Sequence, residues 1–235
     1  MATNNEEFFN LKIHTQYSIC EGAIKIDDLA NYCKINRIKA IGIADSYNLC
    51  GALEFAEKIS KVGTQPIIGT QINLLNENNF GKISLYATSE IGYKNLTKLS
   101  SNSYLNNKDS NYPFIEIDDL ISNSEDIILL TGNYRNFFGK LFYSNKLNLF
   151  KKLIEKLKLS FHDRLYIEIQ RHGEEQELSY ENYLLKISKL YNLPLIAGQE
   201  VYYLEADMAE AHDALICIGE KRFIEEKDRF RYSDQ

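Results

Sequence analysis

The sequence predicts an α/β protein built around a mainly parallel sheet, either closed or open. Short β-rich runs alternate with segments of helical periodicity over most of the 235 residues, and a repeated β-then-α order is typical of parallel strands. The length and the 44% hydrophobic content suit one domain with a substantial core. We therefore expect a single domain over residues 1–235.

The first half of the chain contains the more regular alternation. Apolar, β-rich runs indicate strands at residues 8–13, 40–44, 65–68, 71–75 and 83–87. Helical periodicity indicates helices at residues 27–34, 49–61 and 93–104. Residues 106–112, followed by Pro113, form the most loop-like stretch, which is too short for a linker between domains.

The second half continues the same order with longer helices. Strands are predicted at residues 126–130, 165–170 and 194–197, and helices at residues 146–159, 177–191 and 207–218. Four scattered cysteines form no Cys-x-x-Cys pair, so we expect reduced thiols that mostly fill the core.

Charge and hydropathy exclude several classes of protein. The 27 basic and 33 acidic residues and the pI near 5.4 do not suit direct nucleic-acid binding by this domain. Residues 1–7 are polar and acidic, unlike a signal peptide, and no apolar run is long enough to span a membrane. We expect a cytoplasmic protein that does not contact a membrane.

Polar residues follow the predicted strands at the points where the strands end. In a parallel barrel these ends converge on one mouth, so distant residues meet there. Because polar loops follow strands by default, the pattern alone favours a functional mouth only modestly. The residues concerned are His14, Asp45, Gln71, Asn133, His172 and Glu200.

An ordered set of short motifs points to a particular family, which the positions of polar residues after strands do not do by themselves. The motifs lie at residues 14–18 (His-Thr-Gln-Tyr-Ser), 43–51, 66–69, 92–96, 129–132, 168–173, 193–197 and 210–213. In order and spacing the chain resembles the polymerase and histidinol phosphatase (PHP) domain at the N-terminus of bacterial DNA polymerase III alpha subunits. This resemblance implies a distorted (β/α)7-type barrel with mainly parallel strands.

The resemblance also implies a metal pocket from which several ligands have been lost. His14, Asp45 and His172 stand where the family has them, and Glu21 falls where an acidic ligand is usual. The other positions differ from the family's metal-binding pattern. There, Lys12 replaces a histidine, Ser46 stands where Asp-His is common, Gln71 replaces a carboxylate, Asn133 replaces Cys or His, and Glu200 and Tyr202 replace an Asp and a His.

These exchanges oppose metal binding, because hydrolytic metal ions need anionic or imidazole ligands. We expect a vestigial pocket that holds no metal ion, with Lys12 paired to Glu21, Asp45 or Glu200. In a second interpretation Lys12 points to solvent and His14 is only a hydrogen-bonded histidine. In a third, zinc or manganese binds a residual site formed by His14, Asp45, His172 and Glu200.

The resemblance implies a structural and partner-docking role within a replicative polymerase. Its partners would be the rest of the alpha subunit and the separate proofreading exonuclease subunit. By the same resemblance we expect this chain to lack the palm, which holds magnesium, and the fingers and thumb, and to be incomplete at the C-terminal edge of the domain. The alternatives are an active metal-dependent phosphoesterase or 3′–5′ exonuclease, and an unrelated barrel enzyme. His162 is expected on the surface, and His212 in a packing or capping role.

Overall fold

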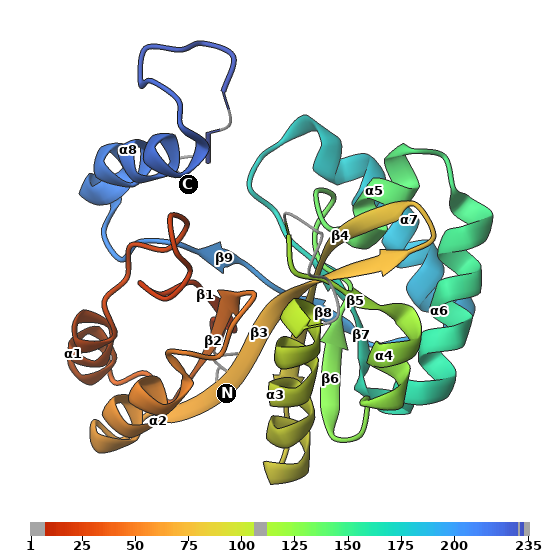
Figure 1. Cartoon of the computed structure of the whole chain (residues 1–235), viewed down its shortest axis with the longest axis horizontal. Coiled ribbons are helices and arrows are strands. Elements are labelled where there is room, and N and C mark those ends of the chain that lie inside the picture. Colours follow the sequence, from red (N-terminus) through yellow and green to blue (C-terminus); the bar gives the residue numbers. More distant parts are fainter. Residues whose placement is uncertain (1–7, 106–111, 230, 233–235) are drawn as a thin grey trace, which may run out of the picture.

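The computed structural model describes residues 8–105, 112–229 and 231–232, and within them a single curled sheet organises the chain. The strands lie in the order β8-β7-β6-β4-β3-β2-β1-β9, with β5 added beside β3. Helices cover the outer side of the curl, and α8 lies at the end that carries β9 (Figure 1). The strands are β1 (Lys12–Ile13), β2 (Ala40–Ser46), β3 (Gln65–Asn76), β4 (Asn79–Ala87), β5 (Ile115–Glu116), β6 (Ile127–Leu130), β7 (Leu165–Ile169), β8 (Leu195–Ala197) and β9 (Glu200–Val201).

The predicted α/β class and the mainly parallel sheet are confirmed. Every paired strand runs parallel to its neighbours except β4, which is antiparallel to both β3 and β6. A two-residue turn joins β3 to β4 directly, which is too short for the crossover connection that a parallel pair needs, so the chain reverses direction there. Among the described residues no ladder joins β8 to β9, so the sheet forms a half-barrel in place of a closed one.

Three of the predicted strands differ from the structure. Residues 65–68 and 71–75 belong to the single strand β3, which passes through Gly69 without a break. A Cβ at Gly69 would lie 2.3 Å from the Tyr86 ring, so the glycine there admits the ring of the neighbouring strand. The first predicted strand is shorter than residues 8–13, because only Lys12 and Ile13 pair with neighbouring strands.

The helices agree with the predicted segments to within a few residues, and two short helices were not predicted. The additional helices, α4 and α5, have six and seven residues, which is too short for clear periodicity. The helices are α1 (Ile26–Asn36), α2 (Ala52–Lys61), α3 (Glu90–Leu105), α4 (Ile117–Ser122), α5 (Phe137–Tyr143), α6 (Leu147–Phe161), α7 (Glu175–Tyr191) and α8 (Ala209–Glu220). Residues 106–111 of the predicted loop lie outside the described part.

Helix α6 shows how the sequence places the core. Its buried residues recur at helical spacing and make one apolar stripe that faces β6 and β7: Phe150, Leu153, Ile154, Leu157 and Phe161. They belong to the larger apolar cluster, which spans β3 to β7 and the helices that cover those strands. A smaller cluster lies between β1, β2, α1 and α2. A third, smaller cluster contains Ala44 of β2, Tyr86 of β4 and Leu130 of β6.

Cysteine placement and hydropathy complete the description. All four cysteines are free; Cys33 and Cys217 are buried, as predicted for core residues, whereas Cys50 is exposed and Cys20 is half-buried. Within the described ranges no helix is long and apolar enough to cross a membrane.

Candidate functional site

Lys12 is buried and forms an ion pair inside the half-barrel. Its Nζ lies 2.7 Å from Oε2 of Glu168 and 3.7 Å from Oε1 of Glu200, and the side chains of Lys12 and Glu168 are 1% and 0% exposed. The interpretation in which Lys12 points to solvent is therefore wrong. Of its three predicted partners only Glu200 is near, and the closest partner is Glu168. A carboxylate within the apolar strand β7 is the sequence signal that could have identified it.

Glu200 lies at the start of β9 and receives several hydrogen bonds. Gln71 donates to Oε1 at 2.5 Å, and Tyr202 and Asn133 donate to Oε2 at 3.2 and 3.5 Å. Burial would raise the pKa of Glu200, but Lys12, His14 and the Gln71 hydrogen bond outweigh it and lower the pKa to about 2. The carboxylate is thus held in its charged form between Lys12 and the amides.

His14 is fully buried and stacks on Tyr202. The two ring centroids are 4.5 Å apart with planes 11° from parallel, and Nδ1 lies 3.3 Å from the Ser18 hydroxyl. Within the described part of the chain, Nε2 has no hydrogen-bond partner. Burial is the main reason that the pKa of His14 falls to about 4, although Glu200 opposes the change. His14 is therefore neutral at pH 7.

Asp45, at the end of β2, is committed to the turn that follows β1. The backbone N–H and hydroxyl of Thr15 donate to its two oxygens at 2.6 and 2.7 Å, and the Ser18 hydroxyl donates at 2.6 Å. Burial raises the pKa of Asp45, although the hydrogen bonds from Ser18 and Thr15 oppose the change. Both Asp45 oxygens accept hydrogen bonds that fix the loop. A carboxylate that coordinates a metal ion would instead direct an oxygen at the ion.

Glu21 and Ser46 are brought together by a lysine that the sequence did not single out. Lys82 of β4 donates to both oxygens of Glu21 at 2.9 and 3.0 Å and to the Ser46 hydroxyl at 3.0 Å. The Ser46 hydroxyl donates to Glu21 at 2.5 Å. Burial favours a raised pKa for Glu21, but Lys82 and Ser46 prevail and lower it. Lys82 could not be assigned from spacing, because it lies just before the predicted strand at residues 83–87, not after the end of a strand.

Asn133 and His172 lie beside the buried ion pair. Asn133 donates to Gln170 at 3.1 Å, and His172 Nε2 lies 3.2 Å from the same Gln170 oxygen. Gln170 in turn donates to Glu168 at 2.7 Å. The amide of Gln170 thus connects two predicted pocket residues to the carboxylate that pairs with Lys12.

The residues present do not fit a metal centre. Among the described residues, no group of three or more His, Cys, Asp or Glu side chains is placed to hold an ion. The residual set of His14, Asp45, His172 and Glu200 is accordingly not assembled. Lys12 lies beside Glu200 in the same pocket, where its positive charge disfavours a cation.

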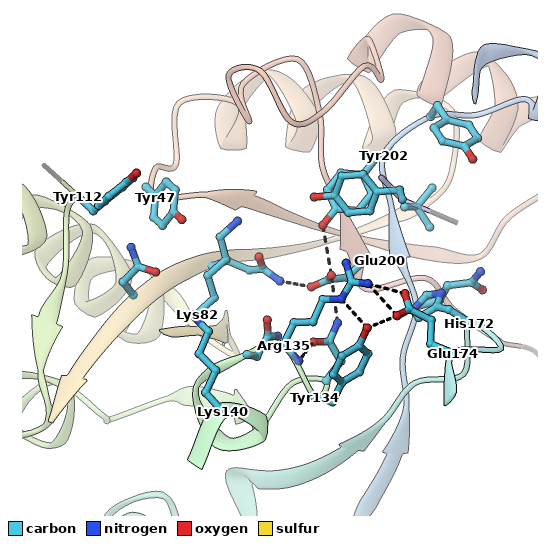
Figure 2. Close-up of a pocket in the computed structure, with 18 of the residues that line it drawn as sticks. Tyr47, Lys82, Tyr112, Tyr134, Arg135, Lys140, His172, Glu174, Glu200 and Tyr202 are labelled. Atoms are coloured by element: carbon cyan, nitrogen blue, oxygen red, sulfur yellow. Dashed lines mark hydrogen bonds and ion pairs between the residues drawn. The ribbon is translucent and has the colours of Figure 1, made fainter. Parts of the chain in front are cut away.

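A cavity of about 540 Å³ opens beside this polar interior. Five of the predicted residues line it: Gln71, Asn133, His172, Glu200 and Tyr202. Figure 2 shows Arg135 and Tyr134 reaching toward Glu174 beside His172. Arg135 donates to the two oxygens of Glu174 at 2.7 and 2.8 Å, and Glu174 also accepts from Tyr134. None of these three residues, nor Lys140, was identified from the sequence: Tyr134, Arg135 and Lys140 lie just before or within the unpredicted α5, and Glu174 lies just before α7.

The remaining two histidines lie where they were expected. His162 is exposed at the end of α6. His212 is buried in α8, where its Nε2 lies 2.7 Å from the backbone carbonyl of Glu21 and its ring lies 5.6 Å from that of Tyr202. It therefore packs α8 against the loop that carries Glu21.

The curled, mostly parallel sheet and the pocket inside it define an α/β protein of the phosphoesterase-like half-barrel type. A structure assigned as a metal-dependent phosphoesterase from Bifidobacterium adolescentis superposes with a TM-score of 0.55 over 83% of this chain and 87% of that one, at 12% identity. The chain belongs to the PHP domain family, whose match covers residues 10–172.

With its sequence relatives the chain shares amino-acid identity over nearly its whole length. The chain is 32% identical over 236 residues to the DNA polymerase III subunit alpha of Caulobacter vibrioides, covering 97% of this chain and 21% of the relative. It is 34% identical over 229 residues to that of Rickettsia bellii, covering 97% and 20%. The chain thus spans about a fifth of the length of these relatives and is homologous to their N-terminal region.

Proposed function

We propose that this chain is the PHP domain of a DNA polymerase III alpha subunit, and that it has a structural and partner-docking role without hydrolytic activity. The observation that carries the proposal is the ion pair of Lys12 with Glu168 inside the family's metal pocket. By this proposal the domain does not itself polymerise DNA, since the palm of the parent subunit would hold the magnesium ions of that reaction.

A fixed positive charge from Lys12 replaces the role of a metal ion in this interior. Hydrolysis in a metal-dependent phosphoesterase requires a metal ion that lowers the pKa of bound water. An ammonium group has no vacant coordination position and only donates hydrogen bonds, so it stabilises Glu168 and Glu200 without activating water. The pocket is thus held together electrostatically while the chemistry is lost.

The docking role follows from the same loss. In this proposal the domain no longer catalyses hydrolysis, and it is retained because it supports other parts of the polymerase. We propose that its partners are the rest of the alpha subunit and the proofreading exonuclease subunit of the replicase, and that it acts in the cytoplasm. The 97% coverage of this chain by alpha subunits supports the first partner.

Binding and hydrolysis are tested separately with the purified chain. Size-exclusion chromatography with the cognate exonuclease subunit is expected to show a stable complex. After incubation with manganese or zinc, the chain is expected to retain no stoichiometric metal and to hydrolyse no phosphoester. Failure to associate would contradict the docking role.

The second candidate is an active metal-dependent phosphoesterase or 3′–5′ exonuclease. The observation that favours it is the open cavity of about 540 Å³ lined by Glu200 and by Tyr202, on which His14 stacks; this cavity is large enough for a substrate. Metal-dependent turnover that disappears in His14→Ala would establish this alternative and overturn the proposed loss of hydrolysis. The exposed His162→Ala variant serves as the control.

A further inference from the structure

The segment that follows α8 forms a loop with a defined shape, which projects from the molecule beyond the helix (Figure 1). We refer to residues 221–229 and 231–232 as the strap. The side chain of Arg222 and the backbone N–H of Phe223 both donate to Glu226, at 2.7 and 2.8 Å. Nε of Arg229 donates to the backbone carbonyl of Ile224 at 3.3 Å. The strap is therefore shaped by its own hydrogen bonds.

Arg229 attaches the strap to α8. Its guanidinium group donates from two nitrogens to the two carboxylate oxygens of Asp213. The planar fork of an arginine matches a carboxylate in this bidentate geometry, which makes the pair stronger and more directional than a single contact. Both residues are half-buried, so solvent screens the pair less than it screens a fully exposed one.

The burial of Cys217 indicates that the strap covers one side of α8. His212 marks the side of the helix that faces the half-barrel, since its ring lies beside that of Tyr202. By the step of an α-helix, Cys217 lies roughly 140° around the axis from His212, on the side of Asp213. Cys217 is nonetheless only 4% exposed, and its backbone carbonyl accepts from the N–H of Arg222 in the strap. We attribute this burial to the strap.

Tyr232 attaches the strap a second time, at the cavity. Its ring centroid lies 4.3 Å from that of Tyr202 and 5.4 Å from that of His212, and Tyr232 lines the cavity. Such separations are those of favourable aromatic pairs. Because Tyr202 also stacks on His14, a continuous series of ring contacts runs from the buried interior to the strap.

The tip of the strap takes no part in these attachments. Phe223 and Ile224 are 74% and 50% exposed. Within the described residues, no side chain of the strap belongs to any of the three apolar clusters of the core. A segment with so few buried apolar contacts can open locally while the rest of the fold stays intact.

We propose that the strap is a movable cover that closes the cavity on the side of α8. Detachment breaks the pair of Arg229 with Asp213 and the ring contacts of Tyr232, and it opens that side of the cavity and uncovers Cys217. A molecule that enters from this side binds only the detached state, so it shifts the population toward that state. The inference goes beyond the proposed docking role and does not depend on it.

The two attachments allow a test in which one is removed and the effect is measured at the other. In Tyr232→Ala, the alkylation of Cys217 by N-ethylmaleimide is expected to be about tenfold faster or more, because local opening controls the reaction of a covered thiol. Mass spectrometry of peptides from the full chain gives the rate for each cysteine. Phe223→Ala, at the exposed tip of the strap, is the matched control and should keep the slow rate.

Cys33 is the internal reference, because it is buried in the cluster of β1, β2, α1 and α2. Its alkylation should stay slow in every variant. An unchanged rate at Cys217 in Tyr232→Ala would overturn the proposal. An equal rise at Cys217 and Cys33 would also overturn it, since the whole fold would then loosen and the strap would not open by itself.

The converse variant measures the opening of the cavity. In Asp213→Ala, nitration of Tyr202 by tetranitromethane is expected to be several-fold faster, although the substitution lies on the side of α8 turned away from that ring. Tyr86, buried in β4, should remain unmodified. No increase at Tyr202 would show that the strap does not cover the cavity and would refute the proposal, as would an equal increase at Tyr86.

Discussion

The ammonium group of Lys12 in β1 lies 2.7 Å from the carboxylate of Glu168 in β7, and neither side chain reaches solvent. These strands are separated along the sheet by β2, β3, β4 and β6. The ion pair therefore spans the inside of the curl and connects two distant parts of the half-barrel. Its geometry explains why a lysine is tolerated in a pocket that the family builds for cations.

Removing one partner of this pair is expected to destabilise the fold. Glu168→Gln keeps the shape but leaves the charge of Lys12 with only Glu200 at 3.7 Å, so the free energy of unfolding should fall by about 3 kcal/mol. Urea denaturation measures the change. The double variant Lys12→Met/Glu168→Gln should lose less than the sum of the single variants. Strict additivity would show that the pair is not coupled.

Restoring the family histidine is not expected to restore metal binding. In Lys12→His the first ligand of the motif returns, but both oxygens of Asp45 remain committed to Thr15 and Ser18. Elemental analysis after dialysis against manganese or zinc should detect no stoichiometric ion, and phosphoester hydrolysis should not appear. A stoichiometric ion with turnover would mean that Lys12 alone blocks the site.

Stability should fall as the pH decreases from 7 to 5. The folded pKa of His14 is about 4, below the ordinary value of 6.5, so the unfolded chain binds a proton that the folded chain does not. The free energy of unfolding should decrease by about 2 kcal/mol over this range. His212, whose pKa burial also lowers, adds to the same slope.

A variant can isolate the share of His14 in this pH dependence. His14→Phe keeps a ring against Tyr202 but cannot titrate, so the dependence of stability on pH should become shallower. Denaturation at several pH values between 5 and 7 provides the test. His162→Asn, at an exposed position, is the control and should retain the original slope. An unchanged slope in His14→Phe would refute the assignment.

The glycine in the middle of β3 should be needed for packing. In Gly69→Ala the new Cβ would meet the Tyr86 ring at 2.3 Å, and overpacking of this kind costs about 1–3 kcal/mol. Thermal unfolding should show a lower midpoint. Tyr86→Leu in the same chain should recover part of the loss by vacating the space. No recovery would indicate that the nearby Leu85 carbonyl, 2.7 Å from the new Cβ, limits the site instead.

Much of the fold could be predicted because local patterns reflect burial. The stripe of α6 and the apolar run of β2 are fixed by which side chains face the core, and both were recognised. The antiparallel direction of β4 was not predicted, since the apolar pattern of a strand is the same in a parallel or an antiparallel pair. The short helix α5, which carries Lys140, gave too little periodicity to detect.

The sequence by itself determined the α/β class, the family and the positions at which ligand chemistry is lost. It identified Lys12 as the decisive exchange because an ammonium group cannot coordinate a cation. Only the tertiary structure decided which carboxylate pairs with Lys12, because Glu168 is 156 positions away and the two meet through the curl of the sheet. The tertiary structure also placed Lys82 and Lys140 at one cavity, since partners over such separations depend on strand direction and helix packing.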